Sequence, residues 1–269
     1  MVSKQQGEQW MMRVPVASWV VLVMVLSCWS AADAAQRFVD LTYTFDETTH
    51  VWPANPPFHR DSTERGGTPT EKWYATGQVA LSEHAGTHMD APVHFAQGQA
   101  GIDGIPVDRL IGPAVVIDVR VAVKEDRDYR VSLSDIHRWE SAHRTIPAGA
   151  IVMLLTGWGV YWTDRERYFG SATPDVPTTL HFPGFSQEVA EFLVAERHIS
   201  GIGIDTASID YGPSQDFVVH RIVNGAGLYG LENVARLDEV PASGATVMAL
   251  PMKIAGGTGA PVRIIAILP

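Results

Sequence analysis

Four apolar runs rich in β-branched residues constrain the fold of this chain more than any other feature. They read PAVVIDVRV, AIVMLLTGW, ATVMALP and VRIIAIL, and each is bounded by glycine or proline. β-Branched side chains pack well on pleated surfaces, so these runs predict strands buried in a sheet. A fifth segment, RFVDLTYTF, alternates apolar and polar residues as a half-buried strand does. The chain is therefore expected to build a β-sheet.

Two other segments have helical character. SLSDIHRWESAH offers Ser134 as an N-cap, with Asp135 in the first turn. SQEVAEFLVAERH begins with Ser186 and places apolar residues on one face, namely Val189, Phe192 and Leu193. Both helices are expected to cover the sheet.

The rest of the sequence predicts one long loop within a single domain. The stretch VWPANPPFHRDSTERGGTPTEK is rich in proline, glycine and charge, which predicts a long loop, and such loops are often functional. No internal repeat, linker or low-complexity tract divides the rest of the sequence. Residues 36–269 are therefore expected to form a single α/β domain, a mixed β-sheet with covering helices.

The N-terminus has the composition of a secretory signal. Lys4 and Arg13 precede a short uncharged run, WVVLVMVLS, and small residues follow in SAADAAQ. This pattern predicts a signal peptide over residues 1–34, cleaved after Ala34, and hence a periplasmic or secreted protein. The apolar run is shorter than the roughly 20 residues of a membrane span, and no later segment reaches that length. An alternative is lipoprotein anchoring at Cys28, which follows Ser27.

Charge and cysteine content exclude several functions. Cys28 is the only cysteine, so the mature chain is expected to contain neither disulfides nor thiolate ligands. Thirty acidic residues outnumber twenty basic ones, and the formal net charge is −10. Nucleic acid is therefore not expected as a partner, because its phosphates need a cationic surface.

A cluster of metal-ligand residue types stands in SEHAGTHMDAPVHF. It places His84, His88, Asp90 and His94 within eleven positions. Imidazole and carboxylate groups suit zinc, manganese or iron once thiolates are absent. Gly86 permits a bend and Pro92 opposes a long helix, so a turn-rich wrap around an ion is expected.

The string HAGTHMDAPVHF resembles the HxGTHxDxPxHF signature of the cyclase family of metal-dependent hydrolases, which includes bacterial kynurenine formamidases and isatin hydrolases. Further similarity lies in VWP, TGW, FPGFS, GIDTASID and LPMKIAGGTGAPVR. The resemblance implies the swivelling β/β/α fold of that family. It also implies a homodimer or homotetramer and a divalent metal, one or two ions, with Zn²⁺ as first choice and Mn²⁺ as the alternative.

The resemblance also implies roles for individual residues. His84, His88 and Asp90 match the family's first metal ligands, and His94 matches its proton donor and acceptor. A histidine and a glutamate twelve positions apart bind the second metal in those enzymes, and His220 and Glu232 stand at that separation here. Trp52 in VWP corresponds to a substrate-contacting tryptophan.

The leading function that follows is hydrolysis of a C–N bond in a small aromatic amide, with N-formylkynurenine as the model substrate. One alternative is an isatin hydrolase-like enzyme for cyclic amides or lactones. Cyclisation or dehydration is another chemistry of relatives. A third possibility is an exported metal-binding or solute-binding protein without turnover.

Several other residues are left with open or ordinary roles. Asp205 and Asp210 in GIDTASID are either supports for metal ligands or turn formers. His181 has no assigned role. The remaining histidines are expected to be surface residues or hydrogen-bonded core residues, and they are His50, His59, His137, His143 and His198. The glycine-rich AGGTGAP lacks a phosphate-binding pattern, and no serine stands in a GxSxG elbow, which argues against a serine hydrolase.

Overall fold

The computed structural model describes Met1, residues 36–65, 67–68 and 70–269. The predicted signal peptide therefore lies outside the described residues, apart from Met1. Residues Arg37–Pro269 form one continuous unit. Within the described residues no helix has both the length and the apolar character needed to cross a membrane.

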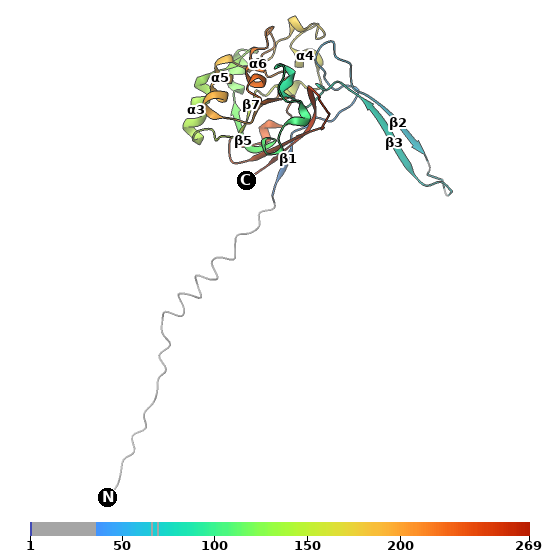
Figure 1. Ribbon diagram of the computed structural model, residues 1–269, viewed down its shortest axis with the longest axis horizontal. Helices are drawn as coiled ribbons and strands as arrows, with labels where there is room; N and C mark the ends of the chain where they lie inside the picture. The colour runs from blue at the N-terminus through green and yellow to red at the C-terminus, as the bar shows by residue number, and fades with distance from the viewer. Residues whose placement is uncertain (2–35, 66, 69) are drawn as a thin grey trace. The chain divides into compact units, whose positions relative to one another are not determined.

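A mixed eight-stranded sheet forms the centre of this unit (Figure 1). Strand β12 pairs with β11 on one side and with β4 on the other, so seven strands close into a ring and β1 lies outside it. Strands β5, β7, β9 and β10 run parallel to their neighbours in this group. In ring order the strands are β12 (Gly259–Ile267), β11 (Thr246–Pro251), β5 (Ile111–Asp118), β7 (Ile151–Leu155), β9 (Gly201–Ile204), β10 (Tyr229–Glu232) and β4 (His88–Asp90), with β1 at Phe38–Asp40.

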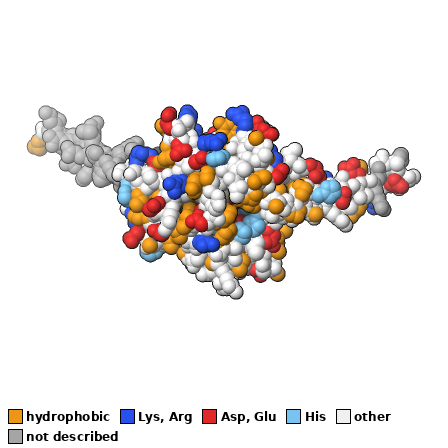
Figure 2. All heavy atoms as spheres, turned by 90° about the horizontal axis from the view of Figure 1, so that it is seen from above, with side chains coloured by type: hydrophobic (Ala, Val, Ile, Leu, Met, Phe, Trp, Pro, Cys, Tyr) orange, Lys and Arg blue, Asp and Glu red, His pale blue; other side chains and the backbone are white. Residues whose placement is uncertain are grey.

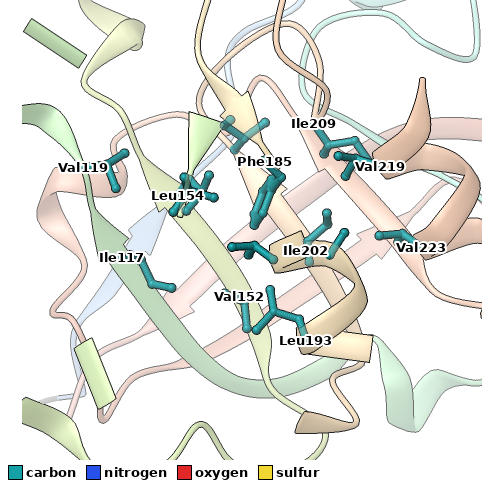
Figure 3. Packing of buried hydrophobic residues seen from close by; sticks show 14 of the residues in the cluster. Ile117, Val119, Val152, Leu154, Phe185, Leu193, Ile202, Ile209, Val219 and Val223 are labelled. Carbon is teal, nitrogen blue, oxygen red and sulfur yellow. The ribbon is translucent and has the colours of Figure 1, made fainter. Parts of the chain in front are cut away.

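The predicted apolar runs are strands that bury both faces. In β7, Val152 and Leu154 pack outward against helices, while Ile151 and Met153 point into the ring. Alternating side chains of a strand point to opposite faces, so a run without polar residues fits this double burial. Figure 3 shows the outer layer, where side chains of the strands meet those of the covering helices. The prediction of a mixed sheet with covering helices is confirmed.

Helices cover the outer face, as expected, with one correction at a cap. They are α2 (Arg120–Glu125), α3 (Leu133–His143), α4 (Arg165–Phe169), α5 (Gln187–Phe192), continued by a π-helical turn, Leu193–Arg197, and α6 (Val218–Gly225). Ser186 caps α5 as predicted. The cap of α3 is Ser132 and not Ser134, because only Ser132 stands three residues before Asp135, and the two form a reciprocal capping box.

The stretch predicted as a long loop contains the first strand of a β-hairpin, whose second strand follows that stretch. The strands of the hairpin are β2 (His59–Arg65) and β3 (Tyr74–Ala80), and Figure 1 shows them as a ribbon separate from the larger sheet. Every residue of β3 is exposed. Strands without a buried face have no apolar alternation, so the sequence pattern gave no sign of them. A second small pairing joins β6 (Arg130–Val131) and β8 (Gly184–Phe185).

RFVDLTYTF is strand only at β1, which pairs Phe38 with Ile267. The expected turn-rich wrap at the histidine cluster is likewise half right. Gly86 does adopt a positive φ of 55°, but the chain then runs straight into β4. His88 and Asp90 therefore share one face of a strand.

Candidate metal centre

Two neighbouring strands present the first donors. β4 and β10 are antiparallel, and their register places His88 opposite Glu232 and Asp90 opposite Gly230. Met89 and Leu231 point into the ring, so the alternate residues His88, Asp90 and Glu232 point outward. Cross-strand pairing thus brings two carboxylates and an imidazole together on the outer face.

Glycines leave the space that Asp90 and its neighbour need. A Cβ at Gly230 would lie 3.3 Å from Asp90 Oδ2. A Cβ at Gly259, which pairs with Asp90 from the other side, would lie 2.6 Å from the Cε1 of His84. Side chains at these two positions would push into the cluster.

Helix α6 and the loop before β4 supply the remaining donors. His220, in the first turn of α6, places Nε2 at 3.2 Å from both Asp90 Oδ2 and Glu232 Oε1. His84 Nδ1 lies 2.7 Å from Asp90 Oδ1. Two overlapping groups result, His84 with His88 and Asp90, and Asp90 with His220 and Glu232, each with donor atoms within 4.8 Å of one another. The structure thus brings together all five predicted ligands, and Asp90 belongs to both groups.

Outer partners fix the orientation of each ring. His220 Nδ1 donates to Asp210 at 2.7 Å, and His88 Nδ1 donates to the carbonyl of Gly86 at 2.9 Å. The Thr258 hydroxyl donates to a glutamate and therefore accepts from His84 Nε2 at 3.0 Å. Each histidine thus keeps a lone pair on its inner nitrogen, as metal ligation requires.

The donor set fits a divalent cation. His88 Nε2 is buried and has no hydrogen-bond partner among the described residues, although it faces Asp90 at 3.2 Å and Glu232 at 3.4 Å. Buried nitrogen and oxygen donors of this kind need a cation or protons to be stable. Without a metal, burial opposes charge on His88, yet the two carboxylates raise its pKa to about 10.

His94 lies beside this cluster and outside both donor groups. Its ring stacks on that of His84 with centroids 4.0 Å apart, and it lies 5.9 Å from the ring of His220. Burial lowers the pKa of His94 to about 4. The ring is therefore neutral at pH 7 and able to accept a proton.

A cavity of about 380 Å³, called the inner cavity, opens above the five donors. Trp52, the residue predicted to contact substrate, lines it and packs edge-on against Phe217 at 5.9 Å. Phe95 lies 5.3 Å from Phe217, and Phe169 completes the aromatic wall. The cavity thus combines polar donors on one side with aromatic rings on the other.

Residues with open roles now have definite contacts. Asp210 supports His220, and its carboxylate also accepts from two backbone N–H groups of α6. Asp205 accepts from Thr156 and Gly157 and touches no metal donor. His181 pairs with Asp128 near the surface.

Sequence reasoning missed His50. It is buried, donates through Nε2 to Trp162 O at 2.7 Å, and lines the inner cavity, while its Nδ1 has no partner among the described residues. The expectation of a surface or fully hydrogen-bonded histidine was therefore wrong here. Its isolated position in THVWP carried no signal.

The closed mixed sheet and the shared-carboxylate donor set define a metal-binding protein of α/β class. The Cyclase family model matches residues 39–211, so the chain belongs to the Cyclase family. An isatin hydrolase of Roseibium aggregatum is 35% identical over 205 residues, covering 73% of this chain and 76% of that protein. A kynurenine formamidase of Salinibacter ruber is 31% identical over 228 residues, covering 84% and 95%.

Solved structures give the same result. Isatin hydrolase A from Labrenzia aggregata, bound to benzyl benzoate, has a TM-score of 0.78 at 32% identity and covers 92% of this chain and 99% of its own. A structure described as a potential metal-dependent hydrolase with cyclase activity has a TM-score of 0.65 at 26% identity, with coverage of 87% and 99%. The resemblance seen in the sequence is confirmed.

Proposed function

We propose that the chain is a metal-dependent hydrolase that cleaves the C–N bond of a small aromatic amide, with an arylformamide as the first substrate to test. Five donors at one end of an aromatic-walled cavity carry this proposal. The names of its relatives, kynurenine formamidase and isatin hydrolase, support the same bond type. A cyclic amide or a lactone is the alternative substrate.

His84, His88 and Asp90 would hold one ion, and Asp90, His220 and Glu232 a second. A divalent ion bound there supplies Lewis-acid activation of a carbonyl and a water of lowered pKa. Zinc is the first candidate and manganese the second, because imidazole and carboxylate donors accept both. Asp90 holds the two sets of donors in fixed relation to each other.

His94 moves the proton in this proposal. Its neutral ring lies against His84, so a ring nitrogen can take a proton from the attacking water. The same nitrogen then gives a proton to the departing amine as the C–N bond breaks. Trp52, Phe95 and Phe217 hold the aromatic ring of the substrate so that its carbonyl lies over the donors.

The test uses metal-loaded enzyme, formanilide and ¹⁸O-labelled water. A hydrolase gives formate that contains ¹⁸O, whereas cyclisation or dehydration incorporates none. His94→Ala is expected to lower kcat at least about 100-fold while metal content by elemental analysis is unchanged. A binding protein without turnover would retain metal and show no hydrolysis of formanilide, isatin or a lactone, and that result would refute the proposal.

Homo-oligomerisation is also proposed, and the exposed hairpin supports it. An isolated two-stranded hairpin is marginally stable in water, yet this one exposes Tyr74 and Val79, and Trp73 just before it. A second copy of this chain would bury these side chains. Light scattering should give a dimer or tetramer mass, and Trp73→Ser with Val79→Ser should lower it.

Export is the remaining proposal, and the composition of residues 1–34 supports it. Expression of the full chain should give a periplasmic or secreted protein whose mass corresponds to cleavage after Ala34. A lipid-modified Cys28 would instead appear as membrane-associated protein with the mass of an acylated chain. Retention of residues 1–34 would refute both forms of the proposal.

A further inference from the structure

Apart from the histidines of the metal centre, the inner cavity contains no cationic side chain among the described residues. Its ionisable groups are the metal-centre residues, His94 and His50. Burial lowers the pKa of His50 to about 4, so its ring is neutral at pH 7. A negatively charged group on a substrate would therefore find no ion-pair partner away from the metal donors.

Apart from its ionisable groups, the cavity is lined by aromatic and uncharged polar side chains, and Asn55 and Ser208 are among the polar ones. Trp52, Phe95, Phe169 and Phe217 line it. When the carbonyl of an aromatic amide lies over the donors, the far side of its ring faces these side chains. A carboxylate there would lose water and gain apolar contacts and neutral hydrogen bonds but no ion pair, which is costly for a charged group.

A second cavity, of about 900 Å³ and called the outer cavity, adjoins the first. The two share His50, Val51, Trp52 and Asn55 as lining residues. The shared segment is a tight turn, because Asn55 N donates to Trp52 O at 3.0 Å and Ala54 has a positive φ of 72°. This turn forms the partition between the cavities.

The charged lining of the outer cavity is acidic. Asp46, Glu47 and Asp175 are its carboxylates, and Arg165 is its one cation among the described residues. Arg165 pairs with Asp175 at 2.9 Å, which leaves Asp46 and Glu47 in excess. Figure 2 shows acidic and basic side chains interspersed on the face that it presents. A like-charged group is disfavoured in such a space.

From these observations we infer that the site selects aromatic amides whose ring carries no negative charge, and that the partition residue Asn55 lies where a charge would change this selectivity. The inference rests on the proposed amide hydrolysis and narrows its substrate class. An uncharged arylformamide or cyclic aromatic amide is a substrate, whereas an amide bearing a free carboxylate on its ring or side chain, N-formylkynurenine included, is disfavoured.

The experiment compares formanilide with 4-formamidobenzoate, which differ by one carboxylate far from the amide. With metal-loaded enzyme, kcat/KM for the anionic compound is expected to be lower by about 100-fold or more, beyond the ratio of their hydroxide-catalysed rates. The neutral 4-formamidobenzamide, of nearly the same size, separates charge from bulk and should be hydrolysed at close to the formanilide rate.

Two substitutions of Asn55 test whether a charge at this position changes the selectivity against anionic substrates. Asn55→Lys adds a cation at the partition and should raise the rate for 4-formamidobenzoate relative to formanilide at least about fivefold. Asn55→Met has similar length without charge and should leave that ratio unchanged. An unchanged ratio in Asn55→Lys, or a rise in both variants, would overturn the role of this position.

Failure of the inference and failure of the proposed function give different results. Equal kcat/KM for the anionic and neutral compounds overturns the inference and leaves amide hydrolysis intact. If no compound is hydrolysed, the proposed function fails, and calorimetric binding of the same compounds decides the inference. Binding of 4-formamidobenzoate as tight as that of 4-formamidobenzamide would then overturn it.

Discussion

The three histidines of the metal centre each use one ring nitrogen to hold the other in place. Their partners differ: a carboxylate holds His220, a backbone carbonyl holds His88 and a hydroxyl holds His84. A carboxylate partner raises the basicity of the ring most, because it stabilises positive charge on the imidazole. Loss of the Asp210 carboxylate should therefore weaken metal binding by His220.

Asp210→Asn is expected to weaken metal binding by about 10-fold to 100-fold, since an amide keeps the shape but not the charge. A competition titration with a coloured chelator measures this affinity. The matched control is Asp238→Asn, which changes an exposed carboxylate outside the two donor groups and should leave affinity unchanged. If both variants bound metal with equal affinity, Asp210 would not support His220 as a metal ligand.

The buried carboxyl group of Asp205 makes the stability of the fold depend on pH. Burial raises its pKa to about 6, although Thr156 and Gly157 donate to it. As the pH falls from 6 to 4, Asp205 therefore becomes protonated in the folded protein while it is still mostly ionised in the unfolded chain. By linkage, this group destabilises the fold above pH 6, and the penalty disappears as the pH falls to 4.

Relative to Asp205→Asn, the native chain should thus gain as much as about 3 kcal/mol between pH 7 and pH 4. Urea unfolding of both proteins at each pH, with chelator present throughout, measures the difference. A constant difference between the two proteins at every pH would show that Asp205 has an ordinary pKa.

The sequence could predict which donor residues come together at the candidate metal centre, but not the residues that support them. His84, His88 and Asp90 stand in one recognisable string, and His220 and Glu232 follow from a spacing. Asp205 and Asp210 lie in the same segment and looked equivalent, yet only one reaches a ligand. The difference depends on where α6 begins, which is a tertiary fact that no local pattern encodes.

The turn that follows β10 connects this strand with the segment before β4 and with helix α4. Asn233 has a positive φ of 54°, a conformation that asparagine tolerates better than most residues. Its side-chain Nδ2 donates to Gly86 O, the carbonyl that holds His88, and its Oδ1 accepts from Tyr168 at 2.7 Å. One buried residue thus ties β10, β4 and α4 together.

Asn233→Gly keeps the backbone conformation and removes these side-chain bonds. It is expected to cost about 1–3 kcal/mol, because Tyr168 loses its close acceptor within the core. Asn233→Ala should cost more, since it also places a Cβ in the left-handed region. Denaturant unfolding measures both. Equal stability of the two variants would show that the positive φ carries no strain.

The hairpin shows where element prediction fails for a physical reason. Burial creates the alternation by which strands are recognised, and β2 and β3 have little of it. Strands β5, β7, β11 and β12 were predicted because burial of one or both of their faces requires runs of apolar residues.

For the whole molecule, the closed ring of strands provides a rigid support for the centre, because each ring strand has a neighbour on both sides. The donors come from β4, β10, α6 and a preceding loop, which lie up to 148 positions apart in the chain, from His84 to Glu232. Cations held by the two donor groups, which share Asp90, would link these elements in the folded state only. Metal binding should therefore stabilise the entire fold.

Removal of metal with a chelator is expected to lower the free energy of unfolding by about 4 kcal/mol relative to protein held at metal concentrations 1,000 times the Kd. For a chain of this size, that corresponds to a fall in Tm of roughly 10 °C. Differential scanning calorimetry measures both states.

Glu232→Gln should lose at least half of this metal-dependent stabilisation, because it removes one charged donor from the group that contains Asp90 and His220. Glu239→Gln, at an exposed ion pair with Arg236, should retain all of it. If chelation left the Tm of the native chain unchanged, the two donor groups would not link these elements through bound metal, and the elements would be held by their apolar packing alone.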